Sequence, residues 1–152
     1  MRRLSTTTLI LSMGVTLAAC GSGSSGGSGG STPSGQPTTG AAAEQAITTL
    51  YTEFFSAPVA QAKTMLEAGD TLDAAFKAAL KLKGDVTESA KVKKVTITSP
   101  TTADVTYELD GDGKPLLPEA NGKAVYVNGK WLVAKATFCG LVQLGTPNVK
   151  GC

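Results

Sequence analysis

A run of small polar residues divides this chain and limits what it can fold into. Residues 21–40 read GSGSSGGSGGSTPSGQPTTG, with no charge and no large apolar side chain. Such a segment buries too little surface to offset the conformational entropy lost on ordering. We therefore predict a flexible tether over residues 21–40, with a root-mean-square reach of about 25 Å. Residues 41–152 are long enough for one compact domain with one core.

The residues before the tether have the pattern of an export signal. A basic start at residues 2–3 precedes an uncharged, mostly apolar run over residues 8–19. That run is too short to cross a hydrocarbon core of about 30 Å as a helix. A basic start, a short apolar run and small residues at its end are typical of a secretory signal. The sequence LAAC at residues 17–20 resembles the lipobox of bacterial lipoproteins.

The lipobox resemblance implies a signal peptide over residues 1–19, cleavage before Cys20 and acylation of the Cys20 thiol, for example by palmitate. One acyl chain binds a membrane only marginally, so stable anchoring takes at least two. The implied location is the extracytoplasmic face of the cell membrane. The alternative is an ordinary secretory signal that happens to end near a cysteine.

The charged residues exclude several functions. With Arg2 and Arg3 removed, the 14 basic residues fall to 12 lysines, which balance 12 acidic residues. A neutral domain without arginine is a poor candidate for binding nucleic acid. The chain has no histidine, which excludes a Ser-His-Asp triad and a histidine-bound zinc site. No pair of carboxylates can be assigned to acid–base chemistry, so we expect no enzyme, no cofactor and no metal.

The first half of the domain has the periodicity of helices. Apolar residues from Ala43 to Phe55 recur at spacings of three and four, which predicts an amphipathic helix. A second helix is predicted over residues 58–67. A third, capped by Asp70 or Thr71, has its apolar positions between residues 72 and 80 and ends at Gly84.

The second half alternates between apolar and polar residues, which predicts half-buried strands. The expected strands cover residues 94–98, 104–109, 123–127 and 130–138, with a polar loop through Pro115 and Pro118. An Asn-Gly pair at residues 128–129 is a strong hairpin signal. The expected fold is α+β, with N-terminal helices packed on a curved antiparallel sheet.

This order of elements resembles the NTF2-like superfold, a cystatin-like cone. Within it, the chain is similar to the mycobacterial low-molecular-weight antigen family and related actinobacterial lipoproteins. The segments that carry the resemblance are FF at residues 54–55, LEAG at 66–69, TADV at 102–105 and GKW at 129–131. Residues 139–152 depart from the pattern. The resemblance implies an exported, non-enzymatic domain and names no ligand.

Cys139 and Cys152 remain after Cys20 is acylated. In an oxidising compartment, an even number of remaining cysteines favours a disulfide. It would close a loop of about 14 residues and contribute roughly 3 kcal/mol. The alternatives are two free thiols, or a dimer linked through Cys152.

Two charged patterns have a structural and a functional interpretation. The sequence DGDGK at residues 110–114 resembles the start of a calcium loop. However, Lys114 occupies a position that needs an oxygen ligand, and Asn121 occupies the position that needs a glutamate. We therefore expect a turn between strands. Six lysines between residues 77 and 94 would fit anionic lipid or cell-wall polymers. The competing interpretation, which we favour, is that they lie on solvated faces.

Five aromatic residues are candidates for lining a pocket in the cone of the sheet: Phe54, Phe76, Tyr107, Tyr126 and Trp131. The competing interpretation is that most of them fill the core. Three functions follow, in order of preference. The first is a lipid-anchored surface protein whose domain binds an unknown protein or envelope partner or serves the envelope structurally. The second is a carrier or sensor of a small apolar ligand, and the third is an enzyme.

Overall fold

The computed structural model describes residues 35–152, which belong to one compact unit. The expected signal peptide, the expected acylation at Cys20 and most of the expected tether lie outside the described residues. None of the helices within residues 35–152 has the length and apolar character needed to cross a bilayer. The described part holds a hydrophobic core and a disulfide of its own, so it has what a domain needs to fold by itself.

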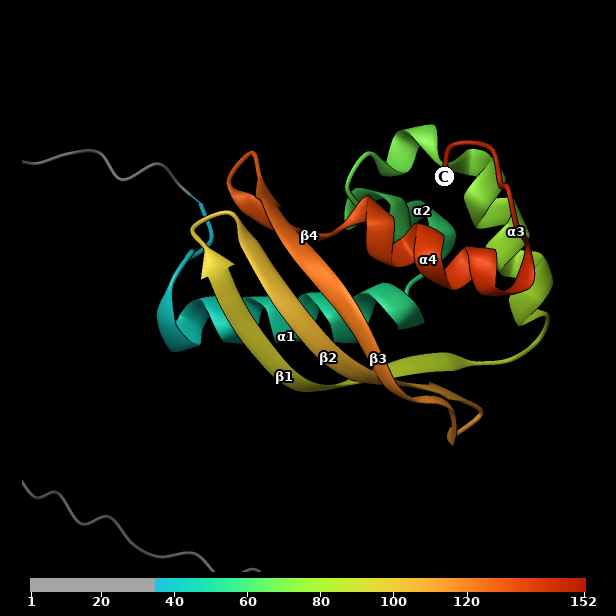
Figure 1. Cartoon of the computed structure of the whole chain (residues 1–152), viewed down its shortest axis with the longest axis horizontal. Coiled ribbons are helices and arrows are strands. Elements are labelled where there is room, and N and C mark those ends of the chain that lie inside the picture. The colour runs from blue at the N-terminus through green and yellow to red at the C-terminus, as the bar shows by residue number, and fades with distance from the viewer. Residues whose placement is uncertain (1–34) are drawn as a thin grey trace, which may run out of the picture. The chain divides into compact units, whose positions relative to one another are not determined.

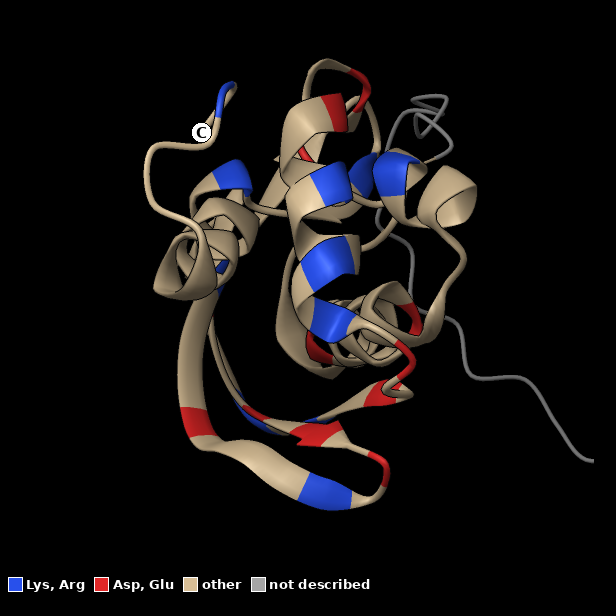
Figure 2. Cartoon of the chain, turned by 90° about the vertical axis from the view of Figure 1, so that its right-hand side faces the viewer, with Lys and Arg blue, Asp and Glu red and all other residues tan. Residues whose placement is uncertain are grey.

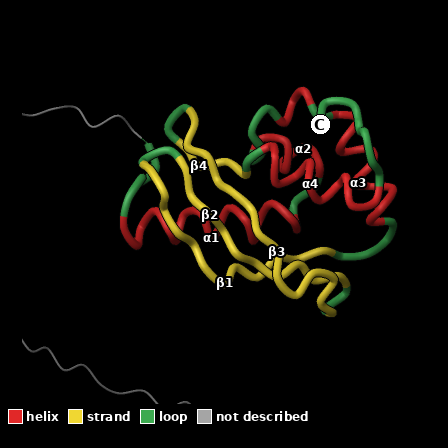
Figure 3. Tube along the Cα trace, viewed as in Figure 1, coloured by secondary structure: helices red, strands yellow, loops and turns green. Residues whose placement is uncertain are grey.

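Helices come first and last, and four strands lie between them (Figures 1 and 3). The elements are α1 (Gly40–Ser56), α2 (Val59–Thr64), a 3-10 turn (Gly69–Thr71), α3 (Asp73–Lys83), β1 (Glu88–Ser99), β2 (Thr102–Gly111), β3 (Lys114–Val127), β4 (Lys130–Val133) and α4 (Lys135–Gly145). The predicted α+β class with helices packed on an antiparallel sheet is confirmed. The finer NTF2-like assignment stays a prediction.

The sheet has the order β1-β2-β3-β4, with every neighbouring pair antiparallel. Helix α1 runs across one face of it, and the strands curve past the helix (Figure 1). The side chains that α1 buries are those of the predicted apolar face: Ala43, Ile47, Leu50, Tyr51, Phe54 and Phe55. Alternate residues of β2 from Ala103 to Leu109 are also buried, as expected for a sheet with one covered face.

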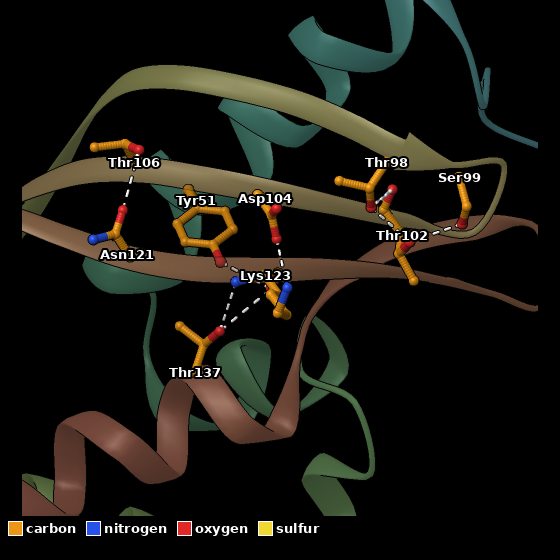
Figure 4. A network of polar contacts seen from close by, with 9 residues as sticks. All are labelled: Tyr51, Thr98, Ser99, Thr102, Asp104, Thr106, Asn121, Lys123 and Thr137. Atoms are coloured by element: carbon orange, nitrogen blue, oxygen red, sulfur yellow. Dashed lines mark hydrogen bonds and ion pairs between the residues drawn. The ribbon is translucent and has the colours of Figure 1, made fainter.

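A polar contact joins α1 to the sheet and to α4 (Figure 4). The Tyr51 hydroxyl donates to the carbonyl oxygen of Lys123 at 2.9 Å, and the Lys123 backbone N–H donates to the Thr137 hydroxyl at 2.8 Å. Gly122 makes this approach feasible, because a Cβ there would lie 2.6 Å from the Tyr51 hydroxyl oxygen. Burial raises the pKa of Tyr51, which keeps this hydroxyl a donor.

The predicted loop through Pro115 and Pro118 is wrong, because both residues lie in β3. The periodicity there is broken by register shifts opposite residues 107–110 of β2. Strand β4 pairs only with residues 124–127, so the prolines occupy a part of β3 with one neighbour. Proline lacks an N–H and is tolerated at such an edge. The predicted turn at Asp112-Gly113 is confirmed, with φ of 51° and 75°.

The last predicted strand is also too long. Strand β4 ends at Val133, and α4 begins at Lys135. Alternation stops at residues 131–134, which are all buried. From there Phe138, Cys139 and Val142 bury one face at helical spacing. This helical spacing was the only signal of α4 that we find in the sequence, and it is weak because it follows the apolar strand without a break.

The second and third helices begin or end within a few residues of their predicted bounds. Helix α2 ends at Thr64, because Leu66 forms a parallel bridge with Val133 and leaves the helix. Helix α3 begins at Asp73, and neither predicted cap forms a side-chain cap. Asp70 and Thr71 instead lie in the preceding 3-10 turn.

Candidate functional site

An open apolar pocket of about 390 Å³ lies at the C-terminal end of α1. Its walls come from α2, α3, α4 and the hairpin between β2 and β3. The main lining side chains are Phe54, Phe55, Ala57, Val59, Ala62, Phe76, Ala79, Leu80, Leu82, Leu109, Leu116, Leu117, Phe138, Leu141, Val142 and Leu144. The volume falls within the range of small-molecule sites, which are mostly apolar.

The local sequence explains why this end of the core is not filled. Helix α1 stops at Ser56 before Pro58, which fixes an extended residue ahead of it. The walls that face the gap carry the small side chains of Ala57, Ala62 and Ala79. A short helix end and three alanines leave space that larger side chains would occupy in a closed core.

The inner wall of the pocket is aromatic. The ring of Phe138 lies 4.6 Å from the ring of Phe76 and 5.9 Å from that of Phe54, measured between centroids. Phe54 also packs edge-on against Phe55 at 5.2 Å. These rings come from α1, α3 and α4, so their contacts hold three helices around the cavity.

The mouth of the pocket is lined by exposed leucines. Leu80, Leu82, Leu116 and Leu144 are 49%, 49%, 51% and 74% exposed, and all four line the pocket. They are also all the large apolar side chains that are exposed within residues 35–152. Single exposed leucines are ordinary, whereas apolar residues gathered at one opening form a candidate binding surface.

Two charged side chains belong to the lining. The Lys83 ammonium lies 3.7 Å from a carboxylate oxygen of Glu88. Burial raises the pKa of Glu88, and the nearby ammonium opposes that shift. The described residues contain no cluster of three His, Cys, Asp or Glu side chains suited to a metal ion. The pocket can therefore bind by apolar contact, with one ion pair at its wall.

The structure separates the five aromatic residues proposed for the pocket. Phe54 and Phe76 line it. Tyr107 is fully buried beside Tyr51 and Phe55, with ring centroids 5.1 and 5.4 Å away. The concave face of the sheet is thus occupied by α1 side chains, and the pocket lies beyond the end of that helix. Sequence periodicity indicated the apolar faces but not where packing would leave a gap.

Tyr126 and Trp131 lie away from the pocket and hold the start of the domain. The Trp131 backbone N–H donates to the Gln36 side-chain oxygen at 2.7 Å, and its indole N–H donates to the Pro37 carbonyl at 2.9 Å. The Tyr126 hydroxyl donates to the Gln36 carbonyl at 2.7 Å. Residues 35–37, expected to be tether, are thus part of the folded domain. We call these contacts the N-terminal clamp.

The predicted pairing of Cys139 with Cys152 agrees with the structure. Their sulfurs lie 2.05 Å apart and their Cα atoms 5.3 Å apart. The bond joins α4 to the end of the chain, where Val149 packs against the core. Because Leu141, Val142 and Leu144 of the same helix line the pocket, the disulfide also restrains one pocket wall.

The six lysines of the predicted cluster separate into two groups. Lys77, Lys81 and Lys83 belong to α3, whereas Lys91, Lys93 and Lys94 belong to β1. Two of the β1 lysines pair with acidic residues of β2: Lys91 with Asp110 at 2.5 Å, and Lys93 with Glu108 at 3.1 Å. Hydrogen bonds from Lys93 and Lys91 hold the pKa of Glu108 below its ordinary value. The β1 group therefore belongs to a paired surface.

No curated protein sequence matches the chain. A family model described as "Low molecular weight antigen MTB12, C-terminal domain" matches residues 40–148, from the first residue of α1 to beyond the end of α4. This is not a known enzyme family, and the match suggests a surface or secreted protein. Since the match covers most of the chain and nearly all of the folded domain, the chain belongs to the family of the low molecular weight antigen MTB12 through its C-terminal domain.

Proposed function

We propose that this protein is a lipid-anchored surface protein that binds a small apolar ligand in the pocket at the end of α1. Cys20 carries the anchor, and the domain lies at the extracytoplasmic face of the cell membrane. The observation that carries the binding function is the open cavity of about 390 Å³ with an apolar wall. Burying apolar surface is the driving force that such a wall offers a ligand.

The anchor rests on the sequence of the first twenty residues and is tested separately. In a bacterial host that processes lipoproteins, the wild-type chain should collect in the membrane fraction and carry acyl groups. Cys20→Ala should remove the acylation, as measured by mass spectrometry of the N-terminal peptide. Acyl groups at Cys20 are the critical readout, because an uncleaved signal could itself hold the variant in the membrane. Wild-type protein without acyl groups would refute the anchor.

The pocket is tested with an uncharged fluorescent probe, N-phenyl-1-naphthylamine, on purified residues 35–152. The wild-type domain should bind the probe and increase its emission. Ala79→Phe places a ring in the pocket wall and should weaken binding at least tenfold. Ala74→Phe is the matched control, since Ala74 is exposed on α3 and does not line the pocket. Equal binding by both variants would refute the proposed site, and no binding by the wild type would refute the function.

Native mass spectrometry of the exported protein identifies the natural ligand. A retained small mass that Ala79→Phe abolishes would support the proposal and name the ligand. Protein that retains no mass and also fails to bind the fluorescent probe would favour the other candidate, a domain that interacts through its surface. The observation behind that candidate is the group of exposed leucines at the mouth.

A further inference from the structure

We propose that the mouth of the pocket docks onto a bilayer with anionic headgroups. Leu80, Leu82, Leu116 and Leu144 would enter the lipid, and the lysines of α3 would lie among the headgroups. The proposal rests on the proposed function, because it gives a water-insoluble ligand a way into the pocket. We call the four leucines with Lys77 and Lys81 the docking surface.

The leucines form a rim rather than a stripe on one element. Leu80 and Leu82 come from the end of α3, Leu116 from β3 near the hairpin turn, and Leu144 from the end of α4. Each is about half exposed or more, and each also lines the pocket. The apolar surface therefore continues from the rim into the cavity. An apolar molecule that passes from lipid to pocket along it need not cross water.

The charge of α3 suits an anionic surface. Lys77 and Lys81 are exposed, and neither forms an ion pair with any residue that the structure describes. Figure 2 shows lysines following one another along this helix on the side that faces the viewer. Near an anionic bilayer each such lysine should raise partitioning about fivefold.

Acidic residues also lie near the mouth and limit the attraction. Glu88 forms an ion pair with Lys83, and Asp112 accepts the Thr87 backbone N–H at 3.0 Å. Asp85 lies two residues beyond the end of α3. The hairpin adds Lys114, so the elements around the mouth carry positive and negative charges in nearly equal number. We therefore expect the leucines to supply most of the binding and Lys77 and Lys81 to supply a preference for anionic lipid.

The residue types favour lipid over a protein partner. Interfaces between proteins concentrate their binding energy in tryptophan, tyrosine and arginine, with leucine under-represented. Surfaces that lie in a membrane interface combine leucine or aromatic side chains with lysine or arginine. The docking surface consists of leucine and lysine, and the domain has no arginine at all. The only tryptophan, Trp131, is buried in the clamp at the other end of α1.

The anchor and the docking surface can act at the same membrane. The clamp lies before α1 and the pocket after it, separated by a helix of 17 residues, or about 25 Å. The chain from Cys20 to Gly35 would span about 50 Å if fully extended. That length allows the pocket end to turn toward the membrane that holds Cys20.

Flotation of residues 35–152 with vesicles tests the docking without the acyl anchor. Vesicles of phosphatidylcholine with one-third phosphatidylglycerol should carry the wild-type domain more strongly than vesicles of phosphatidylcholine alone. The double variant Leu82→Asp, Leu144→Asp should lower partitioning at least tenfold on both. Lys77→Ala and Lys81→Ala should each lower it about fivefold on the anionic vesicles only. Lys94→Ala, exposed on β1 and without an ion pair, is the matched control.

Trp131 reports the orientation. If the domain binds by its pocket end, the emission of Trp131 should stay unchanged when vesicles are added. A shift of that emission, or flotation that the leucine variants leave intact, would overturn the proposal. So would a wild-type domain that does not float, or leucines that instead mediate a dimer in analytical ultracentrifugation.

Uptake of N-phenyl-1-naphthylamine separates this proposal from the function on which it rests. A domain that takes up the probe but does not float retains the pocket function and refutes the docking. A domain that floats but takes up no probe refutes the pocket function and leaves a membrane-binding surface. Far-UV circular dichroism and thermal unfolding of the leucine variants should match those of the wild-type domain, which shows that the variants are folded.

Discussion

The two ends of α1 differ in how completely the core around them is filled. We call the concave sheet face with the α1 side chains on it the closed part, and the pocket with its rim the open end. In the closed part, Ile47, Tyr51 and Tyr107 are fully buried. At the open end a cavity of about 390 Å³ remains, and four leucines face solvent. Since close packing is the norm in protein interiors, the gap at the open end does not contribute to stability.

The largest predicted effect is a difference in the free energy of unfolding between two truncations, of an isoleucine in the closed part and of its isomer leucine at the open end. Ile47→Ala removes three carbons from a site with no exposure and should lower the free energy of unfolding by about 2–5 kcal/mol. Leu144→Ala removes three carbons from a side chain that is 74% exposed and should change it by less than about 0.5 kcal/mol. Urea denaturation of both variants measures the difference. Equal losses would contradict the distinction between the two ends.

Loss of the disulfide should have the next largest effect on the free energy of unfolding. Replacing Cys139 and Cys152 by alanine together opens a loop with a sequence separation of 13 and should cost about 3 kcal/mol. Because Cys139 lies on the helix that lines the pocket, amide exchange should rise in α4 before it rises in β2. Exchange that rises equally in both would show that the two ends unfold as one unit.

Weakening the N-terminal clamp should lower the free energy of unfolding by less, on the order of 1 kcal/mol. Gln36→Ala removes the acceptor of the Trp131 backbone N–H and should also shift the emission of Trp131. Gln143→Ala, an exposed glutamine of α4, is the control and should alter neither stability nor emission. No change in either property for Gln36→Ala would mean that the clamp does not hold residues 35–37.

Two buried tyrosines predict effects of about 1 kcal/mol or less on the free energy of unfolding. Tyr51→Phe removes the hydrogen bond to the Lys123 carbonyl and should cost about 1 kcal/mol. The Tyr107 hydroxyl is buried and has no hydrogen-bond partner in the structure, so Tyr107→Phe should be neutral or slightly stabilising. A clear loss for Tyr107→Phe would indicate a bonding partner of that hydroxyl.

The buried Tyr107 also predicts that stability falls at alkaline pH. Burial raises the pKa of Tyr107 to about 12, above the ordinary value of 10 for tyrosine. The folded state then holds the proton more tightly than the unfolded state. This contribution is complete below pH 10 and is lost as the pH rises toward 12. Thermal unfolding of wild type and Tyr107→Phe between pH 9 and 12 should show the smaller decline for the variant.

The sequence was most informative where periodicity decides the structure. The buried face of α1 and the turns at Asp112-Gly113 and Asn128-Gly129 follow from local patterns. The cysteine pair follows from the two cysteines that remain once Cys20 is acylated. The sequence led to a wrong prediction where tertiary contacts decide the type of element. In α4, for example, the apolar run is compatible with either a strand or a helix. The pocket lay beyond prediction because it depends on where α1 ends relative to α3 and α4. Phe54 and Phe76 were identified by their apolar character, and the rim leucines were not.

The most direct test of the account is a methyl NMR titration of residues 35–152 with N-phenyl-1-naphthylamine. We expect shifts for the methyl groups of the open end, led by Leu80, Leu82 and Leu144. Methyl groups of the closed part, such as those of Ile47 and Val105, should stay in place. Shifts that concentrate in the closed part, or the absence of any shift at saturating probe, would contradict the assignment of the open end as the binding site.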